Sequence, residues 1–323
     1  MPLIDMPVDD LFKYTGSSPC PEDIDIFWDN SIAEMKKIDP KIELIKSDFQ
    51  APNAECFDLF FTGVGGARIH AKYARPKNIS GKCPAIVEFH GYYANSGDWI
   101  DKISYAANGF CIASMDCRGQ GGYSEDVGGV KGNTLQGHII RGLDDDSPSD
   151  LLFSKIFLDA AQLAGIVMGF DEVDETRVGA MGASQGGALT LACASLEPRI
   201  SRLAPVYPFL CDYKRVWDMD LDIDAYQELK NYFRSFDPMH KREKDIFYRL
   251  GYIDLQNIVK RIKGEVIMFT GLMDTICPPS TQFAAYNKIT SKKEVIFFPD
   301  YAHEYIPVQK DITFKFMLKM LDL

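Results

Sequence analysis

The fold of this chain follows from one stretch, Arg177-Val178-Gly179-Ala180-Met181-Gly182-Ala183-Ser184-Gln185-Gly186. Its first half is an apolar run typical of a buried strand, and residues 187–193 after it are permissive for a helix. Gly-x-Ser-x-Gly between a strand and a helix predicts a sharp turn that exposes Ser184. The flanking glycines permit the tight backbone, and a helix N-terminus offers free N–H groups that stabilise an oxyanion. The alternative is that Ser184 only caps the helix.

Composition disfavours several classes of protein. The chain has 323 residues, of which 46% are hydrophobic and 25% charged, and this suits a single large globular α/β domain over residues 1–323. A net charge of −11 disfavours nucleic acid as a partner. No apolar run reaches the roughly 18 residues of a membrane span, and the N-terminus lacks the pattern of a signal peptide. The eight cysteines form no Cys-x-x-Cys pair. A cytoplasmic protein without membrane contact is expected.

Strand-like and helix-like segments alternate along most of the chain. A helix is expected over residues 21–37, and an antiparallel hairpin over 56–73. Apolar runs predict buried strands at 85–89, 110–115, 177–181, 265–270 and 294–298, with helices notably at 150–168 and 280–289. This rhythm predicts an α/β fold whose mostly parallel central sheet is flanked by helices, with an N-terminal helix and hairpin extension. The N-terminal extension is expected over about residues 1–55.

Residues 212–262 interrupt the alternation. They combine aromatic residues with many charges, and two or three short helices fit this pattern best. One interpretation is an ordinary helical excursion that covers an edge of the sheet. The other is a lid, because insertions at the carboxyl ends of strands overhang ligands in such sheets.

A serine nucleophile needs a base, and the chain has five histidines. His303 follows the last predicted strand, so we expect it at the same edge of the sheet as Ser184. Of the other histidines, His70 is expected on the surface of the hairpin and His240 at an exposed helix end. His138 is expected to be structural, and His90 to support a loop.

The acid that orients the base should lie between the serine and the histidine in the chain. Asp274 follows the strand predicted at 265–270 and meets this condition. It would hold His303 in the correct tautomer and stabilise the imidazolium. Asp300 is too close in sequence to His303, and Asp116 precedes Ser184, so both fit poorly.

Two amides are candidates for an oxyanion hole. One belongs to Gln185, the residue after Ser184, and the other to Tyr92 in the loop that follows the strand at 85–89. In the same loop, His90 is expected to support the backbone through a side-chain hydrogen bond.

The glycine-rich stretch Arg118-Gly119-Gln120-Gly121-Gly122 resembles a phosphate-binding loop only in part. Residue 124 is serine, so Gly-x-Gly-x-x-Gly is not completed, and no Gly-Lys-Ser/Thr follows. We expect instead a tight loop beside the serine turn, with Arg118 and Gln120 as supporting side chains. The scattered histidines show no metal-ligand spacing, so neither a metal nor a cofactor is expected.

Six segments are together characteristic: Phe89–Tyr92, Asp116–Gly122, Gly132–Leu143, Gly182–Gly187, Gly271–Pro279 and His303-Glu304. On these segments the chain resembles carbohydrate esterase family 7 of the α/β-hydrolase superfamily, which comprises acetyl xylan esterases and cephalosporin-C deacetylases. The Arg-Gly-Gln-Gly-Gly and Gly-Asn-Thr-Leu stretches are more specific than the serine motif, which all α/β hydrolases share.

The resemblance implies a triad of Ser184, His303 and Asp274, with the Tyr92 and Gln185 amides as the oxyanion hole. It implies that the substrates are small acetylated sugars and cephalosporin C. It also implies a cytoplasmic homohexamer whose active sites face an inner chamber that excludes polymeric xylan.

Three other functions stay open from the residues alone. A serine peptidase would need acidic residues of 212–262 to bind a peptide terminus. A broader short-chain carboxylesterase would use the same triad. A non-catalytic binding protein of the same fold usually has a broken triad, whereas this one is complete in sequence.

Overall fold

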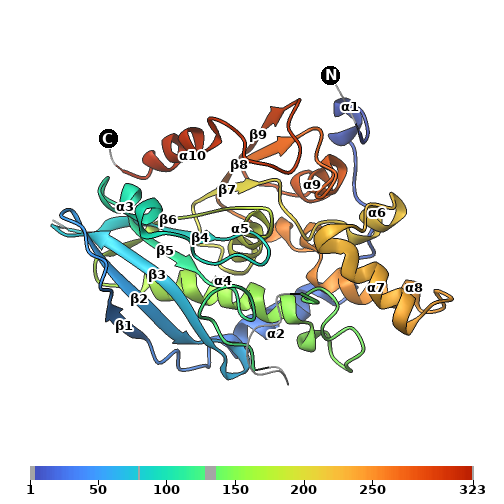
Figure 1. Ribbon diagram of the computed structural model, residues 1–323, viewed down its shortest axis with the longest axis horizontal. Helices are drawn as coiled ribbons and strands as arrows, with labels where there is room; N and C mark the ends of the chain where they lie inside the picture. The colour runs from blue at the N-terminus through green and yellow to red at the C-terminus, as the bar shows by residue number, and fades with distance from the viewer. Residues whose placement is uncertain (1–3, 79–80, 128–135, 322–323) are drawn as a thin grey trace.

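The computed structural model describes residues 4–78, 81–127 and 136–321. Its centre is a nine-stranded sheet in the order β1-β2-β3-β5-β4-β6-β7-β8-β9, with helices on both faces (Figure 1). The strands are β1 Glu43–Lys46, β2 Ala54–Thr62, β3 Arg68–Pro76, β4 Cys83–Phe89, β5 Cys111–Met115, β6 Val173–Ala183, β7 Arg202–Val206, β8 Glu265–Gly271 and β9 Lys293–Phe298. The predicted α/β class is confirmed.

The sheet has an antiparallel part and a larger parallel part. β1, β2, β3 and β5 pair antiparallel, and the pairs from β5 through β4, β6, β7 and β8 to β9 are parallel. The predicted hairpin is the pair β2 and β3, and the expected mostly parallel character is confirmed.

Two strands were not predicted from the sequence. β1 is an edge strand whose four residues are all exposed, so it lacks the alternation that marks a half-buried strand. β7 contains Pro205, which argues against a strand inside a sheet, yet it pairs with β6 on one side and β8 on the other. Tertiary pairing, which the local sequence does not report, decides both.

Helices lie on both faces of the sheet and at one end of the molecule (Figure 1). They are α1 Val8–Leu11, α2 Ile24–Met35, α3 Trp99–Ala106, α4 Leu152–Met168, α5 Gln185–Leu196, α6 Tyr213–Asp218, α7 Gln227–Phe236, α8 Glu243–Leu250, α9 Pro279–Tyr286 and α10 Gln309–Leu318. α4 and α5 pack on the face to which Val87 and Ala180 point. α3 and α10 cover the opposite face, to which Ile86 and Met181 point, because successive strand residues alternate. Within the described residues, no helix is long and apolar enough to cross a lipid bilayer.

Residues 212–262 contain α6, α7 and α8 together with short 3₁₀ turns, in agreement with the predicted two or three short helices. In Figure 1 these helices (orange) form a group beside α9, at the opposite end of the molecule from β1 and β2 (blue). Since β4, β6, β8 and β9 run parallel, their carboxyl ends lie along one edge of the sheet. The loops that leave this edge carry the candidate site.

Candidate active site

Ser184 occupies the turn between β6 and α5 with φ 58° and ψ −118°, a strained conformation for a residue with a side chain. Its amide donates to the Val206 carbonyl (3.0 Å), and its carbonyl accepts from the Phe209 amide (3.1 Å). Gly186 makes the turn possible, since a Cβ there would lie 2.0 Å from the Phe89 carbonyl oxygen. The packing of α5 against β4 therefore holds the serine in this position.

Three side chains that are far apart in the sequence form one hydrogen-bonded chain. The Ser184 Oγ lies 2.9 Å from His303 Nε2, and His303 Nδ1 lies 2.8 Å from Asp274 Oδ2. Asp274 is fully buried, and its Oδ1 accepts the amides of Ile276 (2.9 Å) and Cys277 (2.8 Å). A carboxylate fixed at both oxygens can only accept, so His303 Nδ1 carries a proton and Nε2 is free to accept from the serine.

The alternative carboxylates lie elsewhere. Asp300 is exposed and forms no hydrogen bond or ion pair within the described residues. Asp116 is buried and accepts hydrogen bonds from the Ser96 amide (2.6 Å) and the Tyr123 amide (2.9 Å). Its Oδ2 also lies 2.6 Å from Nδ1 of His70. Burial acts to raise the pKa of Asp116, but these hydrogen bonds outweigh it and lower this pKa to about 2.

The two candidate amides flank the serine turn. Gln185 is the first residue of α5, so its amide has no intrahelical acceptor. Tyr92 belongs to the loop after β4, and within the described part of the chain its amide donates to no other group. This loop passes close to the serine turn, because a Cβ on Gly91 would meet the Ala183 carbonyl at 3.9 Å.

His90 and Gln120 join the Tyr92 loop to the glycine-rich loop. His90 Nδ1 lies 2.7 Å from the Gly91 carbonyl and must donate to it, while Nε2 accepts from the Cys117 amide (2.9 Å). Burial lowers the pKa of His90 and favours this neutral form. Gln120 Oε1 accepts from the Tyr93 amide (3.0 Å), and its Nε2 donates to the Gln185 side chain (2.7 Å).

Arg118 points away from the serine turn. Its guanidinium makes two hydrogen bonds of 2.6 Å to Asp159 on α4 and one of 2.9 Å to the Val64 carbonyl. Both charged side chains are almost fully buried. Arg118 therefore anchors the base of the glycine-rich loop to α4 and to the turn between β2 and β3.

One expectation about the remaining histidines is wrong. His70 is not on the sheet surface but fully buried, since the 116–124 loop covers this part of β3 and Asp116 and Asp58 (3.0 Å) flank its ring. His138 is buried beside the Tyr92 hydroxyl and the Gly119 carbonyl, and His240 is exposed between α7 and α8, as expected. Gly132–Leu135, which contributed to the resemblance, lies outside the described residues.

Sequence reasoning missed two residues near the site. The Tyr207 ring lies 4.5 Å from the His303 ring, and its hydroxyl donates to the Glu304 carbonyl (3.0 Å). Its position after β7 would have been the signal, had that strand been recognised. Glu228 on α7 accepts a hydrogen bond from the Tyr92 hydroxyl. No local pattern links residue 228 to residue 92.

Asp274, Cys277 and His303 place one ligand atom each within 4.8 Å of one another, a spacing that could hold a metal ion. The residues fit this role poorly. His303 Nδ1 is already hydrogen-bonded to Asp274 Oδ2, and Asp274 Oδ1 accepts two backbone amides. Burial raises the pKa of the Cys277 thiol well above its usual value and disfavours the thiolate that a metal requires.

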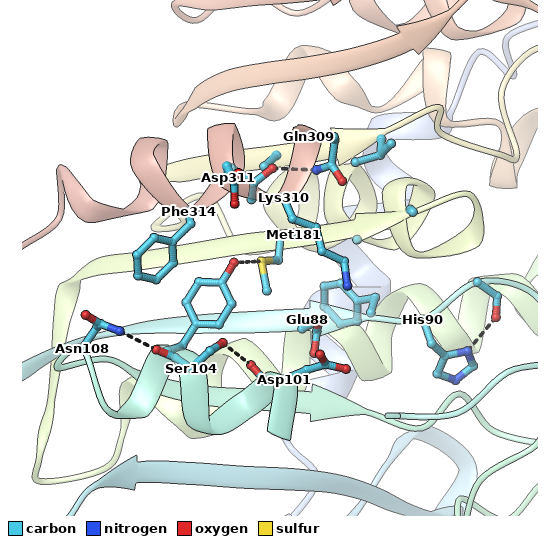
Figure 2. A pocket seen from close by; sticks show the side chains of 18 residues that line it. Glu88, His90, Asp101, Ser104, Asn108, Met181, Gln309, Lys310, Asp311 and Phe314 are labelled. Carbon is cyan, nitrogen blue, oxygen red and sulfur yellow. Dashed lines mark hydrogen bonds between the residues drawn. The ribbon is translucent and has the colours of Figure 1, made fainter. Parts of the chain in front are cut away.

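A cavity of about 530 Å³ lies between α3 and α10, on the face of the sheet that these two helices cover. Figure 2 shows Asp101 and Ser104 of α3 facing Gln309 and Phe314 of α10 across it. Gly182 and Ala183 line it, but the triad side chains do not. The cavity thus reaches the back of the serine turn and is separate from the reactive side chains.

The sequence model of acetyl xylan esterases (AXE1) matches residues 1–320 of this chain. The chain belongs to this family. Acetyl xylan esterase 1 from Thermoanaerobacterium sp. JW/SL YS485 is 60% identical, with a TM-score of 0.95 over 99% of this chain and 100% of that one. The acetyl xylan esterase from Paenibacillus sp. R4 is 33% identical, with a TM-score of 0.91 over 97% and 99% of the two chains. Both likenesses confirm the family resemblance and the α/β-hydrolase fold.

A curated relative, the acetyl esterase Axe7A of Xylanibacter ruminicola, is 26% identical over 291 residues. The match covers 88% of this chain but 63% of the relative, so the chain spans less than two thirds of that protein's length.

Proposed function

We propose that this protein is a serine esterase that removes acetyl groups from small acetylated sugars, with Ser184 as nucleophile, His303 as base and Asp274 as orienting acid. The observation that carries the proposal is the continuous hydrogen-bonded chain from Ser184 Oγ through His303 to the buried Asp274 carboxylate. The family membership supports an ester as the bond that is cleaved.

In the first half of the reaction, Ser184 Oγ attacks the acetyl carbonyl while His303 Nε2 accepts its proton. Asp274 keeps the proton on Nδ1 and stabilises the imidazolium, whose charge it faces at 2.8 Å. The carbonyl oxygen becomes an oxyanion and accepts hydrogen bonds from the amides of Tyr92 and Gln185. His90, Arg118 and Gln120 keep the loops that carry these amides in place.

The oxyanion then collapses, the bond between the acetyl carbon and the sugar oxygen breaks, and the imidazolium of His303 gives its proton to that oxygen. The first half thus ends with the free sugar and an acetyl-enzyme on Ser184. The second half is hydrolysis of this acetyl-enzyme. A water molecule then attacks the acetyl carbonyl, with His303 again as the base. Acetate leaves, and the serine recovers its proton. The reaction uses no cofactor and no metal.

The substrate range and assembly that we propose follow the family resemblance. Acetylated xylo-oligosaccharides and cephalosporin C present an acetyl ester on a small carrier, which suits a homohexamer whose sites face an inner chamber. All eight cysteines lie in the described residues and are free, which supports a reducing, cytoplasmic location.

The test is the change Ser184→Ala, which should reduce kcat on acetylated xylobiose by about 10⁶-fold, as in other serine triads. A fluorophosphonate probe should label the parent at Ser184 and leave the variant unlabelled. Near-normal turnover in the variant would disprove the mechanism. Comparing acetylated xylobiose, cephalosporin C, longer acyl esters and aminoacyl nitroanilides then separates a deacetylase from a broad carboxylesterase and from a peptidase. Light scattering measures the assembly.

A further inference from the structure

Glu228 connects the helical insertion to the loop that carries Tyr92. It lies on α7 and is 7% exposed. Its Oε1 accepts a hydrogen bond from the Tyr92 hydroxyl, and its Oε2 accepts the amides of Ile139 (2.7 Å) and Ile140 (3.3 Å). One carboxylate therefore holds three segments together: α7, the loop after β4 and the chain before α4.

A buried carboxylate is an expensive way to make such a connection. Burial raises the pKa of Glu228, and the hydrogen bonds from Tyr92 and the two amides offset this only in part. Within the described residues, no lysine or arginine forms an ion pair with it. Neutral groups join buried segments at a lower desolvation cost. The charge of Glu228 therefore points to a role beyond stability.

The Tyr92 hydroxyl is fixed from more than one side. It accepts a hydrogen bond from the His138 amide (3.2 Å), and its single proton goes to Glu228. His138 Nε2 faces the Gly119 carbonyl (3.3 Å) and so carries the ring proton, which leaves Nδ1, 3.1 Å from the Tyr92 oxygen, without one. Burial lowers the pKa of His138 to about 4, so the ring stays neutral near pH 7.

The backbone around Tyr92 is held at several points. On one side of Tyr92, His90 ties the backbone to Cys117, and on the other side Gln120 holds the Tyr93 amide. Tyr93 itself has φ 67°, a backbone conformation that residues other than glycine rarely adopt. The Gly91 carbonyl, which belongs to the same peptide unit as the Tyr92 amide, accepts from the Ala94 amide (3.2 Å) and from His90 Nδ1 (2.7 Å). The hydrogen bond of the Tyr92 hydroxyl to Glu228 ties this turn to α7.

We propose that Glu228 is a positioning residue for the esterase reaction: through the Tyr92 hydroxyl, it aims the Tyr92 amide at the oxyanion and couples the helical insertion to catalysis. This inference rests on the proposed function. It gives residues 212–262 a role in the chemical step in addition to any role in covering the site.

The test uses Glu228→Gln, which keeps the volume but replaces one acceptor oxygen by an NH₂ group, and Tyr92→Phe, which keeps the ring and the amide but removes the hydroxyl. Each should reduce kcat on acetylated xylobiose by about 10- to 100-fold, because displacing one oxyanion donor costs up to 10²–10³ in rate. KM should change by less than about threefold, because ground-state binding does not use this donor.

Three further measurements complete the test. Combining both changes should reduce kcat no further than the slower single variant, since they break the same connection. The affinity for a trifluoromethyl ketone, which forms an oxyanion on Ser184, should fall by the same factor as kcat/KM. The control Glu243→Gln changes a partly exposed glutamate of α8 in the same insertion and should leave kcat unchanged.

The outcomes separate the two proposals. Unchanged kcat in Tyr92→Phe, with an inactive Ser184→Ala, overturns the role of Glu228 and leaves the esterase intact. Additive losses in the double variant overturn it as well. An active Ser184→Ala variant instead overturns the proposed function. If Glu228→Gln fails to fold, Tyr92→Phe still decides, because it leaves the carboxylate and its two amide partners in place.

Discussion

Gly186 should tolerate no side chain, and the structure gives the size of the conflict. A Cβ at this position would lie 2.0 Å from the Phe89 carbonyl oxygen and 2.8 Å from the Phe89 carbonyl carbon. Both contacts are with backbone, which has no rotamer to change. Real Cβ atoms essentially never come closer than 3.0 Å to such atoms. In Gly186→Ala, the start of α5 must therefore move away from β4 by about 1 Å.

This displacement acts on the chemistry directly, because α5 begins at Gln185, beside Ser184 and across from the Tyr92 loop. A misplacement of about 1 Å between reacting groups costs on the order of 10² in rate. The overpacked contact should also cost about 1–3 kcal/mol of the free energy of unfolding.

The assay is kcat on p-nitrophenyl acetate, together with urea unfolding of the same preparations. Gly165→Ala is the matched control, because Gly165 lies inside α4 with no atom within 4 Å of an added Cβ. That variant should keep full activity and gain about 0.5–1 kcal/mol of stability. If Gly186→Ala shows parental kcat and stability, the packing argument for the serine turn is refuted.

Three further predictions concern buried carboxylates. Asp274→Asn should lower kcat by about 10⁴ without unfolding the protein, because an amide in place of Oδ2 favours the wrong tautomer of His303; a loss below tenfold would contradict this. Asp159→Ala should cost about 3–5 kcal/mol in urea unfolding, since it leaves Arg118 buried without its partner, whereas the joint change to Arg118→Met and Asp159→Leu should recover at least half of that loss. Asp116 has its pKa lowered to about 2, below the roughly 3.9 of an unfolded chain, so its ionised form stabilises the protein above about pH 4, and this contribution is lost as the pH falls through 2. The difference in free energy of unfolding between the parent and Asp116→Asn should therefore narrow from pH 5 to pH 2. A difference that stays constant over this range would contradict the stabilising role of the Asp116 carboxylate.

The parts of the fold that the sequence predicts are those with a local physical signal. Apolar runs mark β4, β5, β6 and β8, because strands buried on both faces exclude polar residues. β9 is a strand as predicted, but it is only partly buried, since it lies at an edge of the sheet. β7 was missed because Pro205 is a strong local argument against a strand, and only the neighbouring strands show that it belongs to the sheet. β1 was missed because an exposed edge strand has no burial pattern.

Some contacts among the site residues were also predictable from the sequence, and others were not. Ser184, Asp274 and His303 were selected by motif, strand ends and chain order, and the structure brings these three side chains within hydrogen-bonding distance of one another. The partner of Arg118 could not be inferred, because Asp159 lies 41 positions away, in the middle of a mostly apolar helix. His70 was assigned to the surface because nothing near it in sequence shows that the 116–124 loop folds over it.

The sequence alone determined the class of fold, the serine turn and the chain order of Ser184, Asp274 and His303. Each of these depends on residue types within a few positions or on the order in which strands occur. Only the tertiary structure decided which buried polar side chains meet, namely Arg118 with Asp159, His70 with Asp116 and Glu228 with the Tyr92 hydroxyl. These contacts join residues 41 to 136 positions apart. A hydrogen bond forms only when its two atoms are placed to within a few tenths of an ångström, and the packing of the whole sheet and its helices sets these positions.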